Sequence, residues 1–261
     1  MHILVCVKRV PMVGGKIAVT SDGQDVDTRM SGFTVSPHEE CAVEEAVRLT
    51  ERLGGTVTVL TLGPAEAADQ LRDMLALGAG RALLLETDGR EWGPIATAEA
   101  IADVARSRAD GPDGPFGLLL FGNEAADTGD YQVAVRVSHM LGLPCVTGIK
   151  DLEIDGGGGR ARREYRGSEE VFDIPLPAVI SVKEGINLPR YPSLPGRLRA
   201  KRAVIDVVAM NTGHPQRHPE GLRKDGLRVP AQEHQQAKVL GSGAEAVPAL
   251  VRLLEELGVL S

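Results

Sequence analysis

The sequence predicts an α/β protein in which helices cover both faces of a mainly parallel sheet. Two observations lead to this prediction. Short apolar segments alternate with amphipathic helical segments through the first two thirds of the chain, and the apolar segments are nearly continuous instead of alternating with polar residues. Strands that are buried on both faces carry such continuous apolar runs, because neither face meets water. The expected domain therefore has three layers: helices, sheet, helices.

The first elements follow from their residue patterns. Residues 3–7 form an apolar run typical of a buried strand, and residues 39–52 repeat apolar side chains at helical spacing. Ser36-Pro37 before this segment is a helix-start signal, and acidic residues in the first turn suit the helix dipole. The alternation continues as strand and helix in turn: 56–62 and 65–77, 82–86 and 95–106, 118–121 and 131–141.

The pattern changes after Gly148. Residues 150–154 and 160–164 flank Asp155 and four glycines, which predicts a hairpin, and 176–182 reads as a buried strand. Residues 184–201 look like a basic, proline-rich loop, 209–240 are polar, and 244–257 predict an amphipathic helix. We therefore divide the chain into a domain (1–183), a basic, proline-rich loop (184–202) and an extended C-terminal arm with a helix (203–261), which suggests an arm laid on a partner subunit.

Composition excludes several functions. A net charge of −7 and 3% aromatic residues argue against binding to nucleic acid or to an anionic membrane. Cys6, Cys41 and Cys145 are odd in number and widely spaced, which does not describe a disulfide framework or a metal site and fits a reducing interior. Neither a leader peptide nor a membrane-spanning run is recognisable, so we expect a cytoplasmic protein without membrane insertion.

Ligands of parallel α/β sheets bind beyond the carboxyl ends of the strands, near a switch in strand order. Four loops are expected there: 9–15, 33–38, 62–65 and 122–132. The last reads GNEAADTGDYQ; its small residues would let a ligand approach the backbone, and the next helix would offer N–H groups to an anion. Asp127 and Asp130 are awkward beside a phosphate unless they cap the helix or bind ribose hydroxyls. A polar loop with helix caps is an equally good reading.

No catalytic set is recognisable. Asp127 and Asp130 have only Glu124 as a further carboxylate nearby, so neither an acid–base pair nor a metal site is complete. His214 and His218 have helical spacing, but prolines break the helix that would align them, and no serine or cysteine nucleophile motif appears. We therefore expect no catalytic residues and no metal.

Residues 188–202 carry five Lys or Arg in an acidic protein. One interpretation is a solvated basic face. The other is a docking surface in which prolines stiffen the segment, lower the entropy lost on binding, and hold Leu194 out as an apolar anchor.

Taken in order, several stretches resemble β subunits of electron-transfer flavoproteins. They are LVCVKRVP at the start, SPHEECAVEEAVRL (36–49), LGPAEAADQLRDMLALGAGRA (62–82), GNEAADTGDYQV (122–133), LPAVISVKEGINLPRYPSLPG (176–196) and RLRAKR (197–202). The resemblance covers nearly the whole chain and keeps its spacing.

The resemblance implies a Rossmann-like, adenine-nucleotide-binding domain in a heterodimer whose α subunit holds FAD. Such proteins accept electrons from dehydrogenases and pass them to the respiratory chain or other acceptors, so the chain would be an electron carrier and not an enzyme. AMP or a second FAD would bind here; the resemblance places these nucleotide contacts on Cys6, Ser36, Pro37, His38, Glu39, Leu62, Gly122, Asn123, Glu124, Ala125, Ala126, Asp127, Thr128, Gly129, Asp130, Tyr131, Gln132 and Val133.

The family's recognition loop, which docks on acyl-CoA and other flavin dehydrogenases, falls on 184–201. Its protruding leucine matches Leu194, and Arg190, Tyr191 and Pro195 accompany it as docking candidates. Two departures matter: Leu188 replaces the usual Glu before Pro-Arg, and Ser36 replaces the usual Asn. Because the 122–133 loop is also atypical, AMP and FAD stay open, as does electron bifurcation.

Two other functions remain. A stand-alone adenine-nucleotide-binding regulator could use the same loops but would need neither the docking segment nor the arm. An adenylating enzyme would need a phosphate-grasping motif and a Mg²⁺ site, and neither is recognisable.

Overall fold

The computed structural model describes residues 1–12, 14, 17–109, 114–210, 224–230 and 239–260. These residues form two units, Met1–Leu227 and Arg228–Ser261. The polar segment 209–240, with His214 and His218, lies largely outside the described residues. No described helix combines the length and apolar character that crossing a membrane requires.

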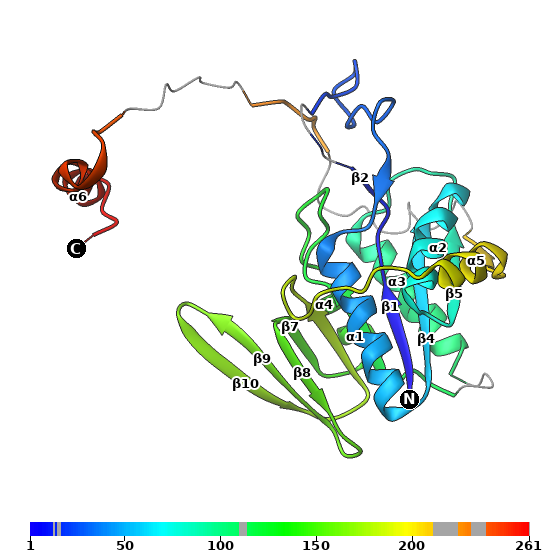
Figure 1. Ribbon diagram of the computed structural model, residues 1–261. Coiled ribbons are helices and arrows are strands. Elements are labelled where there is room, and N and C mark those ends of the chain that lie inside the picture. Colours follow the sequence, from blue (N-terminus) through cyan, green and yellow to red (C-terminus); the bar gives the residue numbers. More distant parts are fainter. Residues whose placement is uncertain (13, 15–16, 110–113, 211–223, 231–238, 261) are drawn as a thin grey trace. The chain divides into compact units, whose positions relative to one another are not determined.

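A seven-stranded sheet forms the centre of the first unit (Figure 1). Every pairing in it is parallel, which confirms the predicted fold class. In spatial order the strands are β12 (Asp206–Ala209), β5 (Arg81–Glu86), β4 (Thr56–Gly63), β1 (His2–Cys6), β6 (Leu118–Gly122), β11 (Ala178–Val182) and β7 (Cys145–Ile149).

Helices cover both faces of this sheet. Alternation along β1 sends Ile3 and Val5 into a core shared with α1 (Pro37–Leu53) and α2 (Ala68–Leu77). Leu4 and Cys6 point into the opposite core, with α3 (Pro94–Ser107) and α4 (Val133–Leu141). A short 3₁₀ turn, η1 (Ala65–Ala67), precedes α2. The carboxyl ends of the strands are left for loops.

A smaller antiparallel sheet contains the predicted hairpin. Its order is β10 (Ser168–Ile174), β9 (Gly159–Tyr165), β8 (Asp151–Ile154), and its inner residues Leu152, Ala161 and Ile174 join the core on the α1 side. A two-stranded ribbon, β2 (Val10–Pro11) with β3 (Phe33–Thr34), follows β1.

The expectation of a loop through residue 201 was wrong for its second half, which forms α5 (Leu194–Arg202). Ser193 caps this helix, because its Oγ accepts a hydrogen bond from the N–H of Gly196 at 3.1 Å, and a proline is tolerated in a first turn. The helix packs closely on α2: a Cβ added to Gly196 would lie 2.9 Å from the carbonyl oxygen of Ala76.

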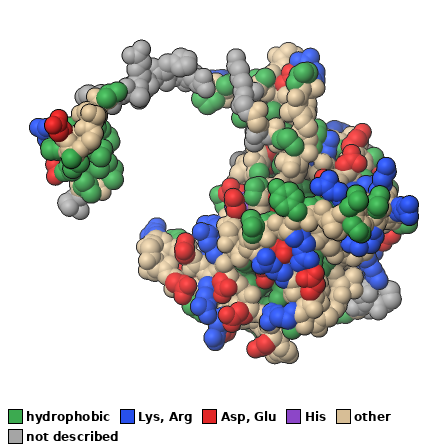
Figure 2. Space-filling model, viewed as in Figure 1, with side chains coloured by type: hydrophobic (Ala, Val, Ile, Leu, Met, Phe, Trp, Pro, Cys, Tyr) green, Lys and Arg blue, Asp and Glu red, His purple; other side chains and the backbone are tan. Residues whose placement is uncertain are grey.

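The second unit contains η2 (Gly243–Ala246) and α6 (Val247–Glu256), close to the predicted helix. None of its described residues is buried. Large apolar side chains are exposed on and after this helix, where Figure 2 shows hydrophobic side chains gathered: Val247, Leu250, Val251, Leu257, Val259 and Leu260. An amphipathic helix in this state has an apolar face without a core of its own.

Candidate functional site

The candidate site lies where β1, β4 and β6 end. The chain builds β4 and β5 on one side of β1 and then places β6 on the other, so the strand order switches between β1 and β6. Cys6 and Gly122 end these two strands, and Leu62 is next to last in β4. Ser36 and the first turn of α1 lie beside the same rim, where Glu39 contacts Lys8 and approaches Gly122.

Glu39 links three of these segments. Ser36 and Glu39 form a reciprocal capping box at the start of α1: Glu39 N–H donates to Ser36 Oγ (3.3 Å), and Ser36 N–H donates to the Glu39 carboxylate (3.0 Å). The same carboxylate accepts from Ser36 Oγ at 2.9 Å and from the main-chain N–H of Lys8 at 2.8 Å. A Cβ at Gly122 would lie only 2.6 Å from Glu39 Cγ, so glycine is needed where β6 passes α1.

Burial shifts the pKa values of two groups at this rim, Glu39 and Cys6. Burial raises the pKa of Glu39 to about 7, although hydrogen bonds from Ser36 and Lys8 oppose the rise. Burial, followed by the nearby Glu39 charge, raises the pKa of the Cys6 thiol well above its usual range. Cys6 is therefore a neutral, apolar contact, and Glu39 uses its oxygens within the protein to position the rim.

The loop 123–132 is tied to β1 by an ion pair. Lys8 Nζ lies 2.7 Å from Asp127 Oδ1, and this oxygen also accepts from Thr128 N–H at 2.9 Å. Asp130 accepts from Thr128 Oγ1 (3.0 Å) and Gln132 Nε2 (3.2 Å). Both aspartates are thus engaged within the protein: Lys8 offsets the charge of Asp127, whereas Asp130 receives hydrogen bonds from neutral groups.

Helix α4 begins at Val133, two residues later than predicted, and no described side chain caps it. Its first turn contains no acidic residue, so its N–H groups and the positive end of its dipole suit an anion. Gly129 has φ +67° and open space around it. Tyr131 is 58% exposed, and Ala126 is also exposed.

Two further candidates connect the rim to neighbouring strands. Asn123 Oδ1 accepts from Ser181 Oγ on β11 at 3.3 Å, and that hydroxyl accepts from Gly148 N–H at 3.0 Å. His38 Nδ1 accepts from the N–H of Glu184 at 2.7 Å, and its Nε2 lies 3.8 Å from Glu124 Oε1. The nucleotide candidates therefore contact the start of the proposed docking segment.

The structure brings together Cys6, Ser36, Glu39, Gly122 and Asp127 around the end of β1. Leu62 is separate from Ser36 and Glu39, because its side chain packs with the core on the α3 and α4 side of the sheet.

Two basic residues at this rim were missed by the sequence analysis. Lys8 contacts both Glu39 and Asp127, and its signal was available: it is the first cation after a buried parallel strand. The Arg9 guanidinium lies 3.2 Å from the centre of the Phe33 ring, and its buried Nε has no hydrogen-bond partner among the described residues. Of these two cations, Lys8 is paired with Asp127 and Arg9 stacks on Phe33.

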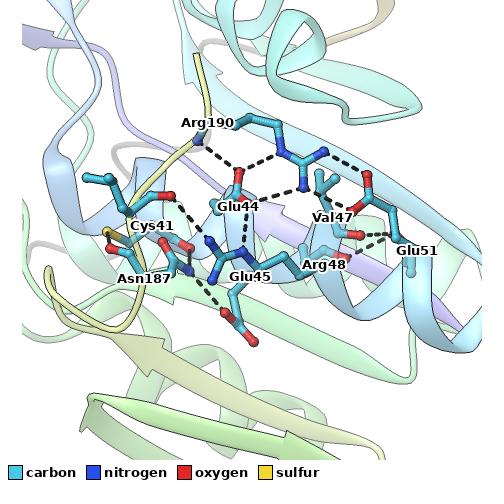
Figure 3. Close-up of polar contacts among 11 residues, drawn as sticks. Cys41, Glu44, Glu45, Val47, Arg48, Glu51, Asn187 and Arg190 are labelled. Atoms are coloured by element: carbon cyan, nitrogen blue, oxygen red, sulfur yellow. Dashed lines mark hydrogen bonds and ion pairs between the residues drawn. The ribbon is translucent and has the colours of Figure 1, made fainter. Parts of the chain in front are cut away.

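The docking candidates have different environments. Tyr191 is 94% exposed, Leu194 is 72% exposed, and Pro195 is exposed. Arg190, by contrast, is bound by Glu44 and Glu51 of α1 (Figure 3).

Comparisons with known proteins show which family the chain resembles. The family model for the electron transfer flavoprotein domain matches residues 26–212. The electron transfer flavoprotein subunit beta of Bacillus subtilis is 35% identical over 81% of this chain and 80% of its own length. That of Syntrophomonas wolfei is 36% identical over 80% of each chain. The mitochondrial one of Oryza sativa is 35% identical over 80% of this chain and 81% of its own.

Proposed function

Because the chain belongs to the electron transfer flavoprotein family as a small, β-type subunit, we propose that it binds the adenylate part of AMP or FAD at the rim around β1 and β6. Proteins of this family carry electrons by means of flavin and do not catalyse a reaction on a metabolite. The flavin supplies the redox chemistry, and the protein holds and presents it.

One observation carries the nucleotide proposal: Lys8 neutralises Asp127 beside the uncapped start of α4. An adenylate phosphate that binds there would meet helix N–H groups, while Lys8 holds Asp127 and the loop residues Thr128 and Gln132 hold Asp130. Cys6 and Leu62 would offer apolar contact on the α3 and α4 side. We also propose that residues 36–39 and 122–133 contact the nucleotide.

We further propose that the chain pairs with an α subunit that holds FAD and that α6 packs on that subunit. The exposed apolar residues of the second unit, which lacks a core among its described residues, support this. Dehydrogenases would dock through residues 184–201, where Tyr191 and Leu194 are exposed. Electron bifurcation would require a second FAD in place of AMP. The cytoplasmic location of the protein stays a prediction.

The test is to co-express the chain with an α subunit, release the nucleotides by denaturation, and count them. One FAD with one AMP per heterodimer supports a simple carrier, and two FAD support the bifurcating type. Lys8→Gln should weaken retention of the nucleotide about tenfold, because it leaves the charge of Asp127 unpaired beside the phosphate. Lys150→Gln is the control, since Lys150 pairs with Glu164 on the small sheet. A complex without adenine nucleotide would refute the proposal.

A stand-alone nucleotide-binding regulator is distinguished by point variants. A regulator would not need residues 184–201, so deleting them would be the direct test. That deletion would also remove most of α5 and its packing on α2, so a loss of function would not report on docking alone. Leu194→Asp changes an exposed residue and should leave nucleotide binding intact. Loss of electron transfer from an acyl-CoA dehydrogenase supports the carrier; unchanged transfer would count against docking through this segment.

A further inference from the structure

The segment between β11 and α5 is held along α1 in successive contacts. Glu184 N–H donates to His38 near the start of the helix. Asn187 Nδ2 donates to the Cys41 carbonyl and to Glu45 Oε2, both at 3.0 Å. Arg190 then reaches Glu44. The segment therefore runs beside the helix instead of looping freely into solvent.

These contacts repeat every three residues. Asn187 and Arg190 face α1 with their side chains, and Glu184 contacts it only through its main-chain N–H, whereas Leu188, Tyr191 and Leu194 are 84%, 94% and 72% exposed. Prolines occupy the remaining positions, 189, 192 and 195. A period of three is that of polyproline II, which these prolines favour, and Ser193 at the start of α5 has φ −69° and ψ 156°; the turn at Gly185, with φ +94°, lies before this stretch. The exposed residues thus form one apolar row, which we call the ridge.

Arg190 is the most firmly held of the inward residues (Figure 3). Its Nε and Nη2 donate to the two oxygens of Glu44 at 2.9 and 3.1 Å, and Nη1 and Nη2 donate to Glu51 at 2.7 and 3.0 Å. Its main-chain N–H also donates to Glu44 Oε2 at 3.1 Å. Four of the five guanidinium N–H groups are occupied, so little remains for a partner protein.

Glu44 anchors the arrangement from within the protein. Its side chain is 2% exposed, and it also accepts from Arg48 Nε at 2.7 Å. Burial alone would raise the pKa of Glu44, but hydrogen bonds from Arg190 and Arg48 lower it, so the carboxylate is charged. Arg48 Nη2 continues to the Leu188 carbonyl at 3.3 Å. Glu44 thus contacts Arg190 directly and Leu188 through Arg48, on the two sides of Pro189.

We propose that Glu44 is a positioning residue for docking: through Arg190 it holds residues 187–193 against α1, so that Leu188, Tyr191 and Leu194 stand out as one ridge. The inference rests on the proposed docking function, but it assigns Arg190 to the ridge's support and adds Leu188 to the docking surface. The partner is a redox protein with an apolar groove lined by carboxylates, because α5 continues from the ridge with exposed cations: Arg197, Arg199, Lys201 and Arg202.

Hydrogen exchange of the complex with the α subunit tests the positioning without any dehydrogenase. Glu44→Gln should speed exchange of the Arg190 amide about tenfold or more, since that N–H loses a charged acceptor. Arg190→Lys keeps the positive charge but loses the planar set of guanidinium N–H donors, and it should give a smaller increase in the exchange rate of the amide at position 190. Amides of α1 and the nucleotide content should not change. Equal acceleration throughout α1, or an unchanged Arg190 amide, would overturn the inference.

Docking is then measured with an acyl-CoA dehydrogenase reduced by octanoyl-CoA, using the complex as electron acceptor. Leu188→Ala and Glu44→Gln should each raise KM for the complex about fivefold to tenfold and leave kcat unchanged. Val171→Ala, on an exposed apolar residue of β10, is the control and should change neither. A normal KM for Leu188→Ala would overturn the ridge. A wild-type complex that accepts no electrons would refute the docking function. The hydrogen exchange of the Arg190 amide would still decide whether Glu44 positions the segment.

Discussion

Glu39 allows a quantitative test of how the rim is built. Replacing it by Gln keeps the size of the side chain and removes its charge. The carboxylate accepts from three donors, Lys8 N–H, Ser36 N–H and Ser36 Oγ, and it is almost wholly buried. A neutral amide can accept at one oxygen only, so its NH₂ group would face at least one of these donors.

The pH dependence follows from the pKa of Glu39, which burial raises from 4.5 to about 7. Between these values the folded protein binds a proton that the unfolded chain does not. The contribution of Glu39 to stability is therefore greatest below pH 4.5 and falls as pH rises to about 7. The full fall is about 3 kcal/mol, since each pKa unit is worth 1.36 kcal/mol.

Urea unfolding of the chain between pH 5 and 8 measures this. The free energy of unfolding of the wild type, minus that of Glu39→Gln, should decrease with pH by up to about 3 kcal/mol. Glu169→Gln, on an exposed residue of β10, makes the same change in charge and should run parallel to the wild type. A difference curve for Glu39→Gln that is flat across this range would refute the reasoning.

Three further outcomes are expected. Gly122→Ala should destabilise the protein by about 1–3 kcal/mol in thermal unfolding, because the new Cβ would meet Glu39 Cγ; an unchanged midpoint would contradict the close approach. Ser193→Ala should cost about 1 kcal/mol and speed amide exchange in α5, because its cap is lost; Ser193→Thr is the matched control. Removal of 228–261 should leave the first unit folded by circular dichroism but abolish co-purification of the α subunit; retention of the α subunit would contradict a docking role for α6.

The main sheet was predictable because its strands are continuous apolar runs separated by clear breaks. Strands with weaker patterns were missed. β7 is interrupted by Gly148, β10 is largely charged because one face meets water, and β12 is a four-residue edge strand inside a segment that otherwise reads as polar. α5 was read as loop because prolines precede it and its composition is basic, although Ser193 before Leu194-Pro195 is a helix-start signal.

The position of the site followed from the rule for parallel sheets, but its internal contacts did not. Glu39 was named as a nucleotide contact, whereas its oxygens are used by Ser36 and Lys8. The pairing of Lys8 with Asp127 joins residues 119 positions apart. Spacing along the chain carries no signal for such a contact, which arises only when β1 and β6 become neighbours in the sheet.

The three-residue repeat along α1 fixes which residues of the proposed docking segment face the helix and which face solvent. Removing one residue between Asn187 and Ser193 would rotate all that follows by about a third of a turn, so side chains meant for solvent would turn toward the helix. Removing three would keep the remaining outward side chains in register, but any three consecutive residues taken from 188–192 include Arg190, so its hold on Glu44 would be lost. Single substitutions at the outward positions leave this register intact, so in the proposed docking they would change the contact surface without loosening its support.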